Sequence, residues 1–319
     1  MGELDLNNRG GVLIFVLWVI MFLTIMALSL GQRVRVGLAF VDGHSGEVKA
    51  KALAWAGVAG AVERVRDSGP GQRDTLYACG LRVPEGQTPQ TLFRHVGLGE
   101  GTFDVAYTQD GKISDGIQDE ERKINLNALN AQEEKVLYSL VQLSGLNADQ
   151  ADVFSDGIFH RLTSGRLESL EEILLIPGVS KDMYEKVKDV LSVYPKAAFV
   201  LKVNLNTASR RVIGALARAQ LEEHLSVEDA DHLTDKMLAF RAGDDGQEGT
   251  PDDKPIEFSK IDFNVTEKIL AEKIARYRSE SSNYLRIRSR GIYKKSTQTL
   301  NVVIYRPHLS IVAWRLENP

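Results

Sequence analysis

The chain has 319 residues, of which 43% are hydrophobic, and its formal net charge is -4. This length and composition suffice for a sizeable core and suggest two domains beyond any anchor. The slightly acidic balance argues against a dedicated nucleic-acid binder, which usually carries a basic excess. A single cysteine, Cys79, excludes an intrachain disulfide. Without partners at fixed spacing, its side chain is expected to be buried and inert.

Residues 10–30 form an unbroken apolar run almost at the N-terminus. About 20 helical residues rise roughly 30 Å, the thickness of a bilayer's hydrocarbon core. A secretory signal peptide, a plain anchor and a prepilin leader all place apolar residues here. The helical pattern continues past the run, and the short polar segment before Gly10 and Gly11 suits a peptidase that cuts on the cytoplasmic side. The sequence therefore predicts a leader over 1–10 and a transmembrane helix over 11–31.

The segment 47–65 reads as a second helical stretch with a small-residue surface. One stripe at helical spacing consists of Val48, Ala52, Trp55, Ala59, Val62 and Arg66. Residues 42–46 interrupt the pattern and should bend or loosen the rod, and Ser-Gly-Pro-Gly at 68–71 ends it. Strand-like runs follow at 75–83, 90–96 and 102–108. Together, residues 32–122 are expected to form the first part of a helix-on-sheet domain.

From residue 123 the pattern becomes helical and an internal repeat appears. Lys-Ile-Asn-Leu-Asn-Ala at 123–128 returns as Lys-Val-Asn-Leu-Asn-Thr at 202–207. Each Asn-Leu-Asn places an Asn side chain where it can accept from the free N–H groups of the following helix, so an N-cap is the simplest explanation. The sequence predicts an inserted all-α domain over 123–279, with repeat units at about 123–195 and 202–279.

The first unit contains a helix-hairpin-helix pattern. Ser169 opens a short apolar helix, Pro177 and Gly178 form a hairpin, and a second helix is expected over 181–191. Such a hairpin can hold a phosphate on its backbone N–H groups. The neighbouring acidic residues, among them Glu171, do not suit DNA, so we interpret the motif as a packing unit. A membrane-tethered DNA-binding protein of an uptake system remains the alternative.

The densest polar chemistry is an acidic loop in the second unit. Its carboxylates are Asp244, Asp245, Glu248, Asp252, Asp253 and Glu257. Hard oxygen ligands on a flexible loop suit Ca²⁺, although the EF-hand spacing is missing. A solvated acidic loop is an equally good interpretation. A weaker group, Asp110, Asp115 and Asp119, is explained by turn chemistry. A hydrolase using these carboxylates has no nucleophile and base at suitable spacing.

Strand periodicity returns in 280–319. Arg286, Arg288 and Arg290 alternate with apolar residues, and such a row is more often a solvated sheet face than a binding site for acidic partners or lipid. Strand-like runs thus flank the helical block. The sequence predicts an α+β fold, in which the long N-terminal helix packs on one antiparallel sheet built from both ends of the chain. The all-α domain, with its two related helix-hairpin-helix-like units, is a large insertion in that sheet.

The order of these elements resembles the K family of minor pseudopilins of type II secretion (general secretion pathway protein K). The resemblance rests on the Arg-Gly-Gly junction and apolar helix, the two Asn-Leu-Asn elements, the Leu-Glu-Glu-Ile-Leu-Leu-Ile-Pro-Gly-Val segment at 170–179, and the closing strands with Trp314. It implies a pilin-like domain with a helical insertion and no enzymatic activity. It also implies a place at the tip of a periplasmic pseudopilus, beside the minor pseudopilins I and J.

The resemblance further implies processing by the prepilin peptidase. Cleavage after Gly10 would make Gly11 the N-methylated first residue, and cleavage after Gly11 would make it Val12. The fifth mature residue is then Phe15 or Val16 rather than the Glu of major pilins. The family can bind calcium through an acidic loop expected in the first unit, after Asp156, whereas the loop lies here in the second.

The predicted protein is a single-pass inner-membrane subunit whose bulk lies in the periplasm, an orientation taken from the leader type rather than from charge. It would assemble with the inner-membrane assembly platform, bind no nucleic acid, cap the pseudopilus and help to start it. The bulky insert would block addition of a further subunit.

Overall fold

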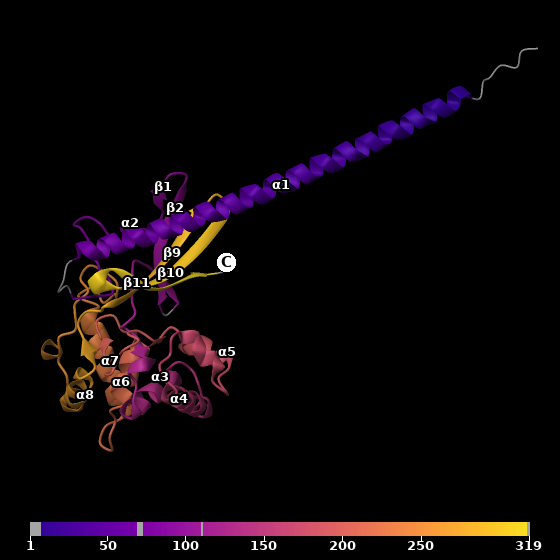
Figure 1. The fold of residues 1–319 in the computed structure, drawn as a ribbon. Helices are drawn as coiled ribbons and strands as arrows, with labels where there is room; N and C mark the ends of the chain where they lie inside the picture. The colour runs from indigo at the N-terminus through magenta and orange to yellow at the C-terminus, as the bar shows by residue number, and fades with distance from the viewer. Residues whose placement is uncertain (1–7, 69–72, 110, 318–319) are drawn as a thin grey trace, which may run out of the picture.

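The computed structural model describes residues 8–68, 73–109 and 111–317. A long helix, α1 (Asn8–Asp67), runs out of the body of the protein as a rod (Figure 1). At 1.5 Å per residue its 60 residues extend over roughly 90 Å. Its C-terminal third lies on one face of an antiparallel sheet, and a helical domain lies on the other side (Figure 1). The predicted α+β architecture is therefore confirmed.

Helix α1 is continuous and runs straight through residues 42–46, where a bend or loosening of the rod was predicted (Figure 1). Gly43 and Gly46 each lower the stability of the helix by about 1 kcal/mol relative to alanine, but the helix-forming residues on both sides keep this segment helical. Gly46 lies directly against Ser296 of the sheet, where a larger side chain would collide. This glycine therefore marks the point at which the rod meets the sheet.

The sheet combines strands from both ends of the chain. Its strand order is β1-β2-β9-β10-β11, and β3 and β4 pair with β2 and β9. The strands are β1 (Val96–Leu98), β2 (Gly101–Gln109), β3 (Lys112–Asp115), β4 (Gln118–Asp119), β9 (Tyr284–Tyr293), β10 (Ser296–Tyr305) and β11 (Ser310–Glu317). A short 3₁₀ turn, η5 (Arg306–His308), joins the last two. All pairings in this sheet are antiparallel.

The face of α1 that meets the sheet is made of small and apolar residues. It consists of Ala50, Leu53, Ala54, Gly57, Val58, Ala61 and Val65. These pack on Leu285, Ile287 and neighbouring strand residues to form the core of the sheet domain. An added Cβ at Gly291 would overlap the backbone of α1, so glycine here permits the close approach.

Two of the predicted strands do not form. Residues 75–83 are irregular, and the segment 90–96 begins as a helix, α2 (Pro89–Phe93). Thr88 caps this helix through the Thr91 N–H, and proline at its first position is already set for helical geometry. The cap and the proline outweigh the weak strand preference of this segment.

The inserted domain contains two units with the same order of elements. The first has β5 (Ile124–Asn125), η1 (Leu126–Ala128), η2 (Ala131–Glu133), α3 (Glu134–Leu143), α4 (Ala148–Thr163), η3 (Leu170–Leu175), α5 (Lys181–Val187) and β6 (Leu191–Ser192). The second has β7 (Val203–Asn204), α6 (Arg210–Arg218), α7 (Val227–Arg241), η4 (Phe258–Lys260), α8 (Val265–Ala275) and β8 (Arg278–Ser279). Each unit closes with a two-residue parallel pairing, and both share one hydrophobic core.

The repeated asparagines close the units. Asn125 accepts from the Asn127 N–H and caps the 3₁₀ turn η1, as the predicted N-cap requires. Asn204 accepts from the Asn206 N–H within a turn, whereas the helix that follows, α6, is capped by Ser209, so the N-cap prediction was wrong in the second unit. The second Asn has another task, because it holds a distant loop of its own unit. Asn127 bonds both backbone groups of Leu167, 40 residues away. A capping prediction from local spacing could not reveal this longer connection.

Candidate interaction surfaces

The apolar half of α1 has no cover within the chain. From Val12 to Val41 its large hydrophobic side chains are exposed, and one helix in the described residues is long and apolar enough to span a membrane. The predicted cleavage positions lie at its start. Gly10 is in the helix, Gly11 has no neighbour within 4 Å of an added Cβ, and Val12 is exposed. Residues 1–7 of the predicted leader lie outside the described residues.

A second apolar surface lies beside the sheet. The stripe predicted from sequence spacing is on the outer side of α1, where Val48, Ala52 and Ala59 are exposed and Trp55 is half-buried. The ring of Trp55 packs edge-on against Trp314 of β11, with centroids 5.8 Å apart. Small side chains next to a paired tryptophan form a surface on which another helix could pack closely.

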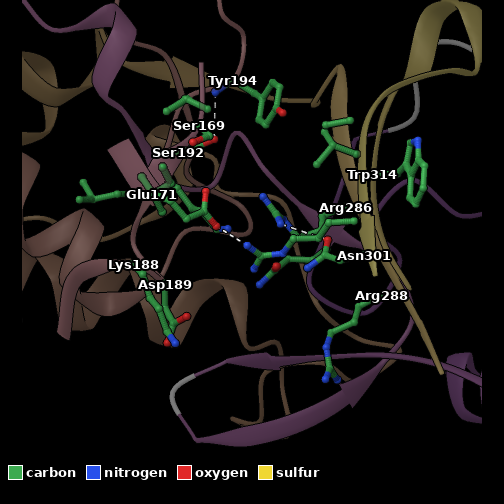
Figure 2. A pocket seen from close by; sticks show the side chains of 18 of the residues that line it. Ser169, Glu171, Lys188, Asp189, Ser192, Tyr194, Arg286, Arg288, Asn301 and Trp314 are labelled. Atoms are coloured by element: carbon green, nitrogen blue, oxygen red, sulfur yellow. Dashed lines mark hydrogen bonds and ion pairs between the residues drawn. The ribbon is translucent and has the colours of Figure 1, made fainter. Parts of the chain in front are cut away.

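A cleft of about 780 Å³ separates the first helical unit from the sheet. Figure 2 shows Glu171 and Tyr194 on the side of the helical domain, and Arg288 and Asn301 on the side of the sheet. Glu317 also lines the cleft, and its carboxylate accepts hydrogen bonds from Arg288 at 2.7 and 2.9 Å and from Asn301 at 3.2 Å. Most groups in the cleft are therefore already paired with one another.

The arginine row of β9 divides between two environments. Arg288 and Arg290 are exposed, as a solvated sheet face predicts. Arg286 is instead covered by the helical domain and pairs with the fully buried Glu120. The inserted domain thus covers Arg286 at one end of the arginine row, while Arg288 and Arg290 stay exposed.

The two domains are joined through a buried cluster of charges. Glu120 accepts from Lys123 at 2.6 Å, from Ser192 at 2.8 Å and from Arg286. Burial opposes the charge of Glu120, but the adjacent Arg286 and Lys123 outweigh it and lower the pKa of this carboxyl. The first unit is thereby held by an ion-pair cluster in which one buried carboxylate faces two cations.

The second unit is held by a carboxylate with neutral partners. Asp119 accepts from Asn204 at 2.9 Å and from Thr207 at 2.6 Å. Burial, and next the charge of Asp74, raise the pKa of Asp119 to about 6. Burial, and next Asp119, raise the pKa of Glu121 to about 7. On this side of the joint Asp74 pairs with Arg306, whereas Asp119 and Glu121 have raised pKa values.

The acidic loop uses its carboxylates to hold itself together. Asp252 accepts from the N–H groups of Asp244 and Asp245 and from Thr250, which, led by the Thr250 hydroxyl, lower its pKa to about 2. Asp253 accepts from the N–H of Tyr77, 176 residues earlier, and so ties the loop to the sheet domain. The sequence left a calcium site and a solvated acidic loop as equal alternatives, and in the structure Asp252 holds the loop through contacts internal to it.

Three of the remaining acidic residues of the loop face cations, whereas Asp245 accepts a hydrogen bond from the Gln247 N–H. Glu248 pairs with the buried Arg241, and Asp244 pairs with Lys254. Glu257 pairs with Lys260 and Arg73. Among the described residues, no three His, Cys, Asp or Glu side chains are arranged to hold a metal ion. In this arrangement the loop does not fit calcium, because each ligand would first have to leave its present partner.

The structure also explains the weaker carboxylate group at 110–119 and the single cysteine. Asp115 pairs with Arg94, whereas Asp119 is buried at the domain joint, so these two carboxylates serve different contacts. Asp110 lies outside the described residues. Cys79 is buried, and burial raises the pKa of its thiol well above the usual value, which agrees with an inert side chain.

The hairpin motif is shorter than predicted. Its first helix is the 3₁₀ turn η3 and its second, α5, ends at Val187 rather than Leu191, because the chain there turns into the closing strand β6. Ser180 caps α5 through the Met183 N–H, and Arg161 pairs with Glu172 beside the hairpin. A protein side chain thus already occupies the helix start at which a phosphate would bind.

Comparison with known proteins agrees with this arrangement. No family model matches the chain. No curated protein sequence is significantly similar to it. Its fold is similar to a chain in the crystal structure of the GspK-GspI-GspJ complex from the type 2 secretion system of enterotoxigenic Escherichia coli, with a TM-score of 0.56 and 15% sequence identity. The similarity covers 90% of this chain and all of the matched chain. The resemblance to the K-type pseudopilins that the sequence predicted is thus confirmed as a similarity of fold.

Proposed function

We propose that this protein is a non-enzymatic minor pseudopilin of a type II secretion pseudopilus, of the K type. The observation that carries the proposal is the rod α1, whose apolar half lies bare while its other end is fixed on a sheet. Exposed apolar side chains over this length are stable only in a bilayer or in the core of an assembly. In a subunit that moves from the membrane into a filament, the same apolar helix would lie first in the bilayer and then in the filament core.

The tip position follows from the bulk of the insert. The helical domain lies on the side of the sheet opposite α1, so it widens the subunit without covering the apolar rod (Figure 1). In our proposal it hinders addition of a further subunit above, and the protein caps the filament and helps to start it. Lower subunits would contact the outer stripe of α1, where Ala52 and Ala59 allow close helix packing.

The start of the helix suits a terminal subunit. Counted from either cleavage position, the fifth mature residue is Phe15 or Val16, and both are exposed and apolar. A carboxylate at this position would pair with the N-terminal amine of a preceding subunit inside a low-dielectric filament. A subunit with nothing above it does not need this pair.

The proposal includes the processing and location expected of this class. The prepilin peptidase would cut after Gly10 or Gly11 and methylate the new N-terminus. The helix would then hold the protein in the inner membrane, with the helical domain in the periplasm, until the assembly platform adds it to the filament. Its neighbours would be the minor pseudopilins I and J, since the matched solved complex is one of GspK with GspI and GspJ.

Intact mass and N-terminal sequencing of protein purified from the native host test this proposal. The expected N-terminus is Gly11 or Val12 with one added methyl group. An N-terminus at Met1 or Gly2 would contradict it and leave a simple anchored protein. DNA binding by the helical domain would then be the next property to measure.

Calcium binding by the acidic loop is a separate proposal, which requires the loop to exchange its internal contacts for ion contacts. Thermal unfolding with and without millimolar Ca²⁺ tests it, using the wild type and Asp252→Asn. A rise of several degrees that the variant loses would support calcium binding. An unchanged unfolding temperature would contradict it.

A further inference from the structure

The two edges of the sheet differ in how they are protected. Natural sheets shield an edge strand by keeping it short, by adding Pro or Lys, or by covering it. The β1 edge is three residues long. The β11 edge is eight residues long and contains neither Pro nor Lys. In the described part of the chain, no backbone hydrogen bond joins the outer side of β11 to another segment.

The side chains of β11 are also unusual for an edge that faces water. Ile311, Val312 and Trp314 are all exposed, and Trp314 retains 55% of its accessible surface. A long edge with open backbone groups and apolar side chains is a template for one more strand. Among the described strands of the sheet, β11 is the longest that has a neighbour on one side only, so the edge needs an explanation.

Space for an added strand exists beside β11. On one face, Leu316 and Trp314 lie toward α1, where Trp55 extends the apolar surface. On the other face, Ala313 packs toward the helical domain, and Arg315 pairs with Glu171 across the cleft. Figure 2 shows the Trp314 ring on the far side of the strands from Glu171, in agreement with its contact with Trp55 of α1. A strand added here would therefore contact apolar side chains on the face toward α1 and polar side chains on the face toward the helical domain.

We propose that the outer edge of β11 binds an extended segment of a partner pseudopilin, which adds a strand to the sheet. This inference rests on the proposed function for the identity of the partner. The segment would alternate apolar residues, which contact Trp55 and Trp314, with polar residues, which face the Arg315–Glu171 pair. Backbone hydrogen bonds would supply affinity and the alternation would supply register.

A second copy of this chain suits the edge less well. Helix α1 runs lengthwise along the strands, since Gly46 lies against Ser296 at one end of β10 and Gly57 lies against Ser289 in β9. Antiparallel pairing of two β11 edges about a twofold axis would reverse one rod relative to the other. The two apolar halves would then point in opposite directions and could not both enter one membrane from the same side.

Hydrogen exchange measured by mass spectrometry tests the proposal directly. The full chain in detergent is compared alone and with the minor pseudopilins I and J of the same host. Strand addition should slow the exchange of about half of the amides in 310–317 at least tenfold, because alternate N–H groups face the open edge. Packing of a helix on α1 would leave those amides unchanged.

A matched pair of variants sharpens the test. Trp314→Lys on the β11 edge should weaken partner binding at least tenfold, whereas Leu98→Lys on the β1 edge, with a similar exposed fraction of 52%, should leave it unchanged. Val312→Lys serves as a second edge variant if Trp314→Lys lowers the unfolding temperature through the loss of its contact with Trp55.

The outcomes separate the two proposals. If I and J bind but β11 gains no protection, the edge inference is wrong and the proposed function stands. If neither binds the wild-type chain, the proposed function and the inference fall together. If β11 becomes protected in the chain alone as its concentration rises, a second copy occupies the edge and the assignment to a partner is overturned.

Discussion

The two helical units have one scaffold but are attached to the sheet in different ways. In each, a second asparagine holds a distant loop, as Asn127 does for Leu167 and Asn206 does for Ile256. The first asparagine differs, since Asn125 donates to Pro195 in its own unit and Asn204 donates to Asp119 at the joint. The repeat therefore preserves the contacts that close a unit and varies those that attach it.

This difference separates two kinds of buried charge. At the first unit, the buried Glu120 meets Lys123 of that unit and Arg286 of β9, so its carboxylate stays ionised. The second unit meets Asp119 with amide and hydroxyl donors, so the charge is only partly compensated. A repeated domain can thus be fixed by an ionised carboxylate between two cations at one unit and by a proton-sensitive carboxylate contact at the other.

The largest expected effect on stability comes from disrupting the buried cluster of Glu120, Lys123 and Arg286. Glu120→Gln leaves Lys123 and Arg286 without their buried partner, and we expect a loss of about 3–5 kcal/mol in the free energy of unfolding. Denaturant unfolding of the full chain in detergent, followed by tryptophan fluorescence, measures it. A loss below about 1 kcal/mol would mean that water reaches this cluster and that the first unit is not fixed here.

Removing the second asparagine of each unit should cost less and should cost about the same in both. Asn127→Ala and Asn206→Ala each leave buried backbone groups without partners, which we expect to cost about 2–3 kcal/mol. The same unfolding measurement compares them. A strong effect in one unit and none in the other would contradict the shared scaffold.

The proton-sensitive contact should make stability fall as pH rises from 5 to 8. The pKa values of Asp119 and Glu121 are raised in the folded state, to about 6 and about 7, so the folded state gains protons that the unfolded chain does not hold. The stabilisation is complete below the unfolded pKa values and is lost as pH passes the folded ones. We expect a decrease on the order of 2 kcal/mol.

Glu121→Gln provides the control for this pH dependence. It removes one titrating group, and the decrease between pH 6 and 8 should become shallower. The Glu120 cluster should not contribute in this range, because its lowered pKa lies well below it. Stability that rises with pH, or a slope that the variant leaves unchanged, would show that other groups control the joint.

The smallest effect is expected at the mouth of the cleft. Arg315 and Glu171 form an exposed pair between β11 and the first unit. Glu171→Gln should change the free energy of unfolding by about 0.5 kcal/mol or less, as exposed pairs do. A loss comparable to that of Glu120→Gln would show that this pair, rather than the buried cluster, holds the first unit against the sheet.

Local patterns in the sequence predicted what depends on local chemistry. The apolar run of α1, the alternation in β9 and the Asn-Leu-Asn repeats are all patterns that a single segment reveals. Helix α2 was missed, although Thr88 followed by proline is a capping signal that could have identified it.

The joint and the edge could not be predicted in this way. Asp74 pairs with Arg306, 232 residues away, and Asp253 bonds Tyr77 across 176 residues. Spacing along the chain contains no information about such contacts, which depend on how the insert returns to the sheet. The carboxylates of the acidic loop looked alike in sequence, but the fold assigns some to backbone N–H groups and others to cations.

Labelling of the helical domain on isolated pseudopili tests the central claim most directly. A gold-coupled antibody against residues 123–279, viewed by electron microscopy on filaments from the native host, reports where the protein lies. A minor pseudopilin that caps the filament predicts label at one end only. Label distributed along the sides, or label only on membranes and never on filaments, would contradict it.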